Sequence, residues 1–163
     1  MGRARLAALD PGRVTSVAPW PGRNVDAALA PLGLHFPPPG TVIAAQGARI
    51  AWAGRQLAFL IGAEPPAALA GVAALTDQSD GWVWVHLSGA DASAVLARLT
   101  PLDLRPSAFA VGTVARTVIN HMQALILRGA EDGFEIAVFA SMAGTLHHEL
   151  TEAMRLVAAR ARI

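Results

Sequence analysis

The chain contains no cysteine, no lysine and no tyrosine among its 163 residues. The lack of cysteine excludes disulfides, thiolate nucleophiles and cysteine-ligated zinc. The lack of lysine excludes a Schiff-base amine and the phosphate-binding lysine of a Walker loop. Charged residues make up only 15% of the chain, the net charge is +1 and no basic stripe is present, so nucleic acid is not an expected partner.

Long hydrophobic runs are also missing. No stretch approaches the roughly 18 consecutive apolar residues that a membrane-spanning helix needs. The N-terminal apolar stretch ends at Asp10 and Pro11 after four residues, which is too short for a signal peptide. We therefore expect a cytoplasmic protein with no membrane contact. The 53% hydrophobic content exceeds what one small domain needs, and it predicts apolar surface that meets a partner.

Proline and glycine concentrate in residues 1–40, which hold seven of the eleven prolines. Because proline removes a backbone donor and keeps its predecessor extended, long helices and central strands are not expected there. Apolar side chains such as Trp20 and Phe36 are more than a solvated tail requires. We predict that residues 1–40 form an extended arm lying on its own domain or on a partner. A disordered tail is the alternative.

Residues 41–163 have the regular patterns of one α+β domain. Short apolar runs predict strands at 41–45, 50–52, 56–61, 82–87 and 134–139. A long β-branched run predicts a strand over 113–128 with a bend near Asn120 and His121. Helices are predicted at 67–73, 90–99 and 141–160. This order favours a mixed or antiparallel sheet with packed helices.

Three details of these elements can be tested. The strand at 82–87 is apolar on both faces, which predicts a central or interface position. Asp91 and Ser141 are expected to cap the last two helices. The final helix should bury the residues that recur at helical spacing, namely Met142, Leu146, Leu150, Met154 and Val157.

His147-His148-Glu149 with Glu152 is the one cluster that resembles a metal site. His148 and Glu152 are four residues apart and would share a helix face, as two ligands should. A third ligand would have to come from elsewhere, and an ordinary polar helix side explains the same pattern. The second interpretation is favoured, so no metal ligand is assigned.

The acids and hydroxyls also lack a catalytic setting. Asp77 and Asp80 flank a predicted turn, where aspartates usually hydrogen-bond their own backbone, and this is favoured over an acid/base pair. Ser79, Ser88 and Ser141 are not in a Gly-x-Ser-x-Gly elbow. No glycine-rich nucleotide motif occurs. We assign no catalytic, cofactor-binding or metal-binding residue to this chain.

The aromatic residues are more typical of packing than of a cofactor site. His86 shares a predicted strand face with Trp82 and Trp84, and a stacked ligand there is weighed against a structural histidine or an interface patch. Packing is favoured. The four tryptophans, Trp20, Trp52, Trp82 and Trp84, are expected to be core and interface anchors.

Several stretches of the chain match one family in order and spacing, namely Asp77-Gln-Ser-Asp-Gly, Leu87-Ser-Gly-Ala-Asp-Ala, Val95-Leu-Ala-Arg-Leu-Thr-Pro-Leu-Asp-Leu104, Phe109-Ala-Val-Gly-Thr-Val-Ala-Arg-Thr117, Asn120-His-Met122 and residues 134–150. Together they resemble the gamma subunit family of heterotetrameric sarcosine oxidase. The resemblance covers about residues 41–160. It departs from the family at Ala140 and Met142, where an arginine and a phenylalanine are expected.

The resemblance implies a fold like the folate-binding domain of the glycine-cleavage aminomethyltransferase. It also implies a non-catalytic structural subunit of a complex that oxidatively demethylates sarcosine. The partners would be alpha, beta and delta subunits, of which the larger ones would carry FAD, FMN, NAD and tetrahydrofolate, and this chain would bind none of these cofactors. The alternative is a free-standing folate-binding protein in one-carbon transfer, in which Asp77 or Asp103 would hold the pterin.

Overall fold

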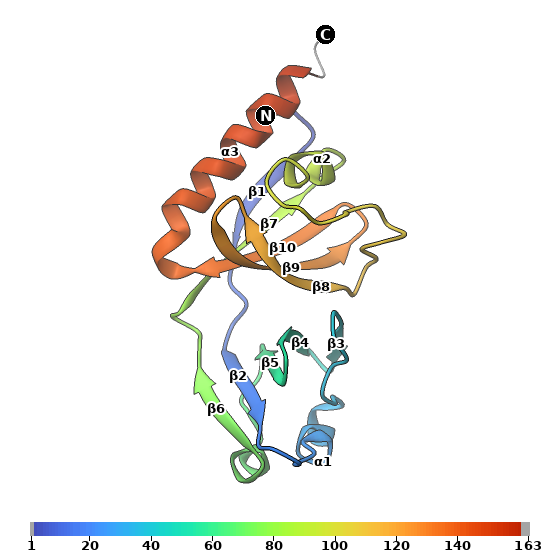
Figure 1. Cartoon of the computed structure of the whole chain (residues 1–163), viewed down its shortest axis with the longest axis vertical. Helices are drawn as coiled ribbons and strands as arrows, with labels where there is room; N and C mark the ends of the chain where they lie inside the picture. The colour runs from blue at the N-terminus through green and yellow to red at the C-terminus, as the bar shows by residue number, and fades with distance from the viewer. Residues whose placement is uncertain (1, 161–163) are drawn as a thin grey trace. The chain divides into compact units, whose positions relative to one another are not determined.

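The computed structural model describes residues 2–160, which form two compact units (Figure 1). The first unit combines the N-terminal residues up to Asp10 with the chain from Trp82 onward, and the second is Pro11–Gly81. Each unit is built on its own five-stranded sheet. In sequence, the second unit is therefore an insertion between the first strand of the first unit and all of its other elements.

The sheet of the first unit is antiparallel throughout. Its strands in spatial order are β1 (Arg5–Leu9), β7 (Trp82–Ser88), β10 (Gly133–Phe139), β9 (Met122–Ala130) and β8 (Val114–Ile119). β7 lies between β1 and β10, which confirms the interior position predicted from its two apolar faces. β1 and β8 are the edges.

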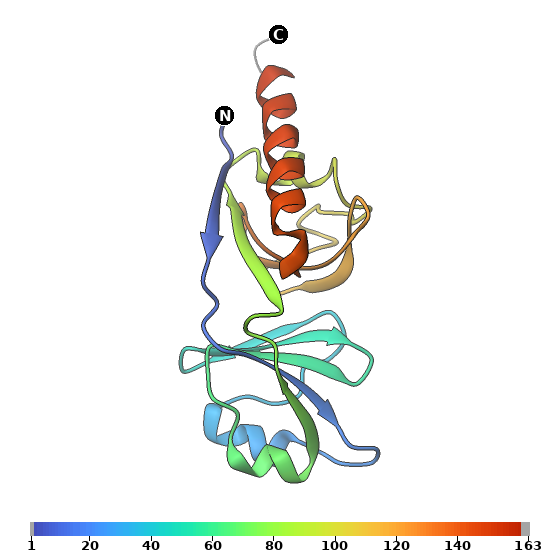
Figure 2. The ribbon, with the colours of Figure 1, turned by 90° about the vertical axis from the view of Figure 1, so that its left-hand side faces the viewer.

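Two helices cover one face of this sheet (Figures 1 and 2). They are α2 (Ala92–Leu96) and the long α3 (Ala143–Arg160), which follows the 3-10 turn η3 (Ala140–Met142). Leu146 and Leu150 of α3 are fully buried in the same core as Phe134 of β10. Burying each such side chain contributes about 1.5–3 kcal/mol, so the α3–sheet contact carries much of this unit's stability.

The second unit has the strand order β3 (Val42–Ala45), β4 (Ala48–Gly54), β5 (Leu57–Ile61), β2 (Val14–Pro19) and β6 (Ala73–Asp77). Its helical pieces are α1 (Asp26–Leu29), η1 (Ala30–Leu32) and η2 (Ala67–Gly71). Val17, Leu60 and Leu69 lie in its separate core. The strands predicted at 41–45, 50–52 and 56–61 correspond to β3, β4 and β5.

The structure corrects the predicted arm over residues 1–40. β1 pairs with β7, and β2 is an interior strand between β5 and β6. The prolines do not prevent this, because Pro11 precedes β2 and Pro19 is its last residue, which leaves every donor from Val14 to Ala18 in place. The division of the chain falls after Asp10 and Gly81 and not at residue 40.

The long strand predicted over 113–128 is two strands, β8 and β9. They pair as a hairpin in which Ile119 lies opposite Met122, so the turn consists of Asn120 and His121 alone. Asn120 has φ 48°, the left-handed conformation that a tight hairpin turn requires and that asparagine tolerates. The expected bend is therefore a complete reversal of the chain.

The predicted 141–160 helix is confirmed as η3 and α3, whereas the two shorter helix predictions hold in position but not in length. The predicted 90–99 helix is the five-residue α2, and the predicted 67–73 helix is η2 followed by β6, a strand that the sequence did not reveal. Met142, predicted to be buried, lies in η3 and is 39% exposed. Ser141 lies within that same turn and not at a cap of α3.

The α+β class with antiparallel sheets and packed helices is confirmed. Across residues 2–160, no helix has the length and apolar character needed to span a membrane.

Candidate functional site

Arg128 organises the most elaborate polar site of the first unit. It ends the apolar run of β9 and only 4% of its surface is exposed. Its Nη1 donates to the backbone carbonyls of Leu104 and Phe109, both at 2.9 Å. Its Nε donates to the carbonyl of Ala130 at 3.4 Å, and its Nη2 donates to that of Glu131. One guanidinium thus joins two separate loops.

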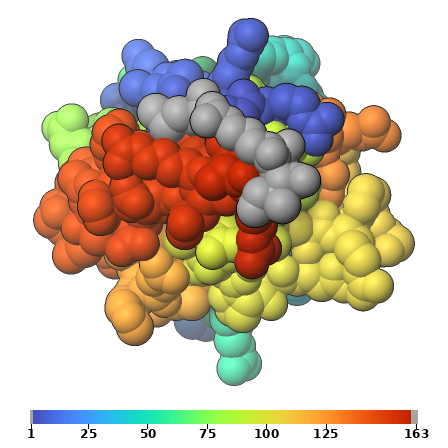
Figure 3. Space-filling view, turned by 90° about the horizontal axis from the view of Figure 1, so that it is seen from above, coloured from blue at the N-terminus to red at the C-terminus, as the bar shows by residue number. Residues whose placement is uncertain are grey.

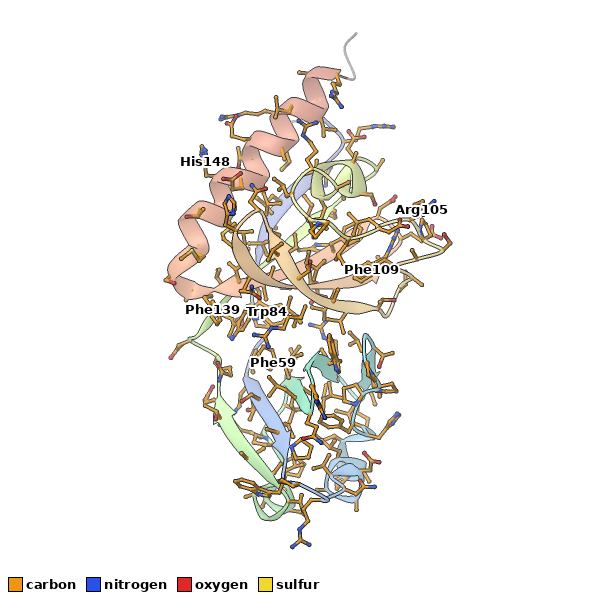
Figure 4. All side chains as sticks on the ribbon, in the orientation of Figure 1. Phe59, Trp84, Arg105, Phe109, Phe139 and His148 are labelled. Carbon is orange, nitrogen blue, oxygen red and sulfur yellow. The ribbon has the colours of Figure 1, made fainter. Side chains whose placement is uncertain are left out.

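Carbonyl groups and an aromatic ring compensate the buried charge. The guanidinium carbon of Arg128 lies 5.1 Å from the centroid of the Phe134 ring, a cation–π geometry. A buried charge is costly unless hydrogen bonds satisfy it, and four of the five N–H groups of the fork have carbonyl partners. The residue holds the loop between α2 and β8, which carries Arg105 and Phe109 (Figure 4). Its role is to shape this loop.

A groove of about 530 Å³ opens beside this loop. Its polar lining consists of Ser93, Asp103, Arg105, Arg128 and Asp132. Asp103 was the acid of the first unit considered for holding a pterin. Its carboxylate accepts hydrogen bonds from the side chain and the backbone amide of Arg105. These bonds hold the pKa of Asp103 at about 2. The carboxylate is therefore ionised and already engaged within its own turn.

Asp77, the other candidate acid, belongs to the second unit and stabilises a turn there. The Ser79 hydroxyl donates to its Oδ1 at 2.7 Å and the Ser79 amide at 2.9 Å, and these bonds lower the pKa of Asp77. The Ser79 hydroxyl in turn accepts from the amide of Val14 at 3.0 Å. The predicted backbone-bonding role of Asp77 is confirmed.

Asp91 acts differently from the predicted helix cap. It precedes α2 but makes no side-chain cap hydrogen bond. Its two oxygens accept from the backbone amide and the guanidinium of Arg3, each at 2.9 Å, and the amide bond is the larger cause of its lowered pKa. Beside it, Gly89 has φ +102°, and a Cβ there would lie 2.1 Å from the Arg3 carbonyl oxygen. Together, Gly89 and Asp91 clamp the chain that leads into β1.

The His147–Glu152 cluster lies along α3 with its members engaged separately. His147 and His148 are exposed, and His148 projects outward from the helix (Figure 4). Glu149 accepts from the Asn120 side chain at 2.8 Å, and Glu152 pairs with Arg155. The part of the chain that the structure describes holds no group of three histidine or acidic side chains placed to bind a metal.

His86 lies on the β7 face that also carries Trp82 and Trp84, as the alternation predicts. Trp84 is buried, and Trp82 is partly buried and packs against Phe139, with ring centroids 4.6 Å apart. Trp20, in the second unit, is half exposed. Two of these tryptophans thus serve as the packing residues that were predicted.

A second groove, of about 550 Å³, lies between β1, β7 and α3. Ala143, His147 and Thr151 line it from one stripe of α3, spaced four residues apart. Leu6, Ala7 and Ala8 line it from β1, Ala4 lines it from the residue before β1, and Val83 and Val85 line it from β7. The surface is mostly apolar. Sequence patterns did not reveal this groove, because its walls are remote in the chain.

Two solved structures are similar to this chain. A chain of the heterotetrameric sarcosine oxidase from Corynebacterium sp. U-96, solved with pyrrole 2-carboxylate, is similar with a TM-score of 0.84 and 26% identity. The match covers 95% of this chain and 85% of that one. The glycine cleavage system aminomethyltransferase T from Bartonella henselae shares the fold, with a TM-score of 0.60 and 16% identity. There, the match covers 91% of this chain but only 45% of the other.

No curated protein matches by sequence. The structural similarities confirm the predicted resemblance to heterotetrameric sarcosine oxidase and the folate-binding-like fold. The family model for the GCVT N-terminal domain matches residues 41–161, most of the chain. The protein therefore belongs to the GCVT N-terminal domain family.

Proposed function

We propose that this protein is a structural, non-catalytic subunit of a cytoplasmic sarcosine oxidase-type complex. One observation carries the proposal. The match to a chain of heterotetrameric sarcosine oxidase covers 95% of this chain and 85% of that one, whereas the match to the aminomethyltransferase covers less than half of that enzyme. The first match therefore favours an equivalent subunit.

The state of the candidate polar groups supports a non-catalytic role. Asp77, Asp91 and Asp103 all have lowered pKa values because of hydrogen bonds that fix turns or the N-terminal segment. An acid/base catalyst working near neutral pH instead needs a raised carboxyl pKa. The flavins, NAD and tetrahydrofolate of the proposed complex would then be bound by the partner subunits, which would oxidise the N-methyl group of sarcosine.

The proposal is tested by co-expressing the tagged chain with the flavoprotein subunits of a heterotetrameric sarcosine oxidase. The expected result is one purified complex with flavin absorbance and sarcosine-dependent oxygen consumption. His148→Ala should leave turnover per flavin unchanged, because this side chain is exposed and projects outward from α3. Purification of the chain without any flavoprotein would contradict the proposal.

The second candidate is a free-standing folate-binding protein, which the family match favours. The acids considered for the pterin do not fit this role well, since Asp77 is bound by Ser79 and Asp103 by Arg105. Calorimetric titration of the isolated chain with tetrahydrofolate decides between the two. Saturable micromolar binding would favour the folate protein, and no binding is expected for the structural subunit.

A further inference from the structure

β1 presents a free sheet edge beside an apolar groove. It pairs with β7 on one side, and within residues 2–160 no strand pairs with its other side. Figure 2 shows β1 as the outermost strand next to β7, with α3 alongside. A strand edge of this kind exposes N–H and C=O groups that pair readily with an extended segment of another chain.

The side chains along this edge are small enough to leave room for a partner. Ala7 and Ala8 are exposed, and Ala4 and Leu6 contribute to the same groove wall. The space-filling view shows α3 on the surface, with the N-terminal segment along one side and the chain after α2 along the other (Figure 3). The groove between β1, β7 and α3 has a volume of about 550 Å³, which leaves room for apolar side chains from an added strand.

The charge pattern indicates the chemistry of the occupant. Arg5 is exposed on β1, and His147 is the one titratable side chain that lines the groove. β1 itself contains no acidic residue. An incoming strand would place a side chain directly across from Arg5, where a carboxylate forms a favourable cross-strand pair. A second copy of β1 has no carboxylate to offer, which argues against self-association at this edge.

We propose that an extended segment of the large partner subunit adds to β1 as a sixth strand of the sheet. Its alternate side chains would be apolar, toward the groove, and one acidic residue would lie opposite Arg5. This inference rests on the proposed function, because it names the surface through which the subunit joins the complex. The mode is backbone pairing combined with side-chain pockets.

The test uses variants of the full chain in the co-expressed complex. Adjacent strand residues point their amides in opposite directions, so one of Ala7→Pro and Ala8→Pro removes an outward amide and the other removes a bond to β7. The variant that keeps the thermal midpoint of the isolated chain is the outward one. Arg5→Glu tests the charge and remains informative if both proline variants unfold. Arg98→Glu, on an exposed arginine that follows α2, is the matched control.

We expect the outward proline variant and Arg5→Glu to bind the flavoprotein subunits about tenfold more weakly, while Arg98→Glu binds normally. If the native chain binds but these variants bind equally well, the β1 docking surface is wrong and the subunit function stands. If the native chain does not bind, both proposals fail. A dimer of the isolated chain that Arg5→Glu dissociates would assign the edge to a second copy and overturn the inference.

Discussion

Replacement of Arg128 by methionine should destabilise the first unit more than any single surface change. Methionine keeps an unbranched apolar stem but removes the guanidinium fork. The carbonyls of Leu104 and Phe109, whose hydrogen bonds to Arg128 are buried, then lose their donor. The carbonyls of Ala130 and Glu131 are only partly buried, and water can replace their bonds.

The magnitude follows from the two buried bonds. A hydrogen bond to a charged group contributes about 1.5–3 kcal/mol, which gives about 3–6 kcal/mol for the pair. Removal of a buried charge returns about 1–4 kcal/mol of desolvation cost. We therefore expect Arg128→Met to lower the free energy of unfolding by about 2 kcal/mol. Arg128→Lys keeps the charge but lacks the fork, so it should also destabilise the unit.

Urea unfolding followed by circular dichroism measures this loss. The free energy of unfolding falls by about 2 kcal/mol per molar urea, so the urea midpoint should fall by about 1 M. Hydrogen exchange should locate the effect in the loop, where the Gly112 amide donates to the Arg128 carbonyl and the Arg128 amide to the Thr113 carbonyl. Arg98→Met, an exposed change, is the control. A midpoint shift no larger than that of the control, with loop amides still protected, would refute the role assigned to Arg128.

Three further predictions follow from the turns and the helix. Gly89→Ala should lower the free energy of unfolding by about 1–3 kcal/mol, because a Cβ would meet the Arg3 carbonyl and φ is +102°. Hydrogen exchange should show the β1 amides losing protection first. Unchanged exchange of the β1 amides would contradict the clamp. Gly144→Ala, which has open space around its Cβ position in α3, should instead stabilise the chain by about 0.5 kcal/mol in the same urea assay, and a lower midpoint would count against the helix geometry. Carboxyl NMR should find the pKa of Asp103 at about 2 and, in Arg105→Gln, a value nearer the ordinary 3.8. Because the folded-state pKa is depressed, the stability from this pair is present above pH 3.8 and is lost as the pH falls toward 2; an Asp103 pKa that Arg105→Gln leaves unchanged would exclude the arginine as its cause.

The sequence predicted those features that depend on local pattern. The interior position of β7 follows from the apolar residues on both its faces. The helix α3 follows from Leu146, Leu150 and Met154, which recur at helical spacing and are buried. The Asp77 turn follows from the chemistry of aspartate beside small polar residues. In each case the signal lies within a few residues of the feature that it predicts.

Features that depend on distant partners were missed. Arg128 binds carbonyls 24 and 19 residues away, and carbonyls have no sequence signature. Asp91 looked like a cap, but its partner Arg3 lies 88 positions earlier in the chain. The proline-rich start hid β2, because proline content is an average over the segment and the strand falls in a gap between prolines. Only a charged residue at the end of an apolar strand hinted at the Arg128 site.

The insertion of the second unit between β1 and β7 has a consequence for folding. These two strands are neighbours, yet the whole of Pro11–Gly81 separates them in the chain. Closing a flexible loop of that length costs about 4 kcal/mol of chain entropy, whereas the β8–β9 hairpin closes over two residues. β1 should therefore pair with β7 late in folding and separate from it early in unfolding. Prior folding of the inserted unit shortens the effective loop, so the order in which the two units form would control how fast the outer strand is completed.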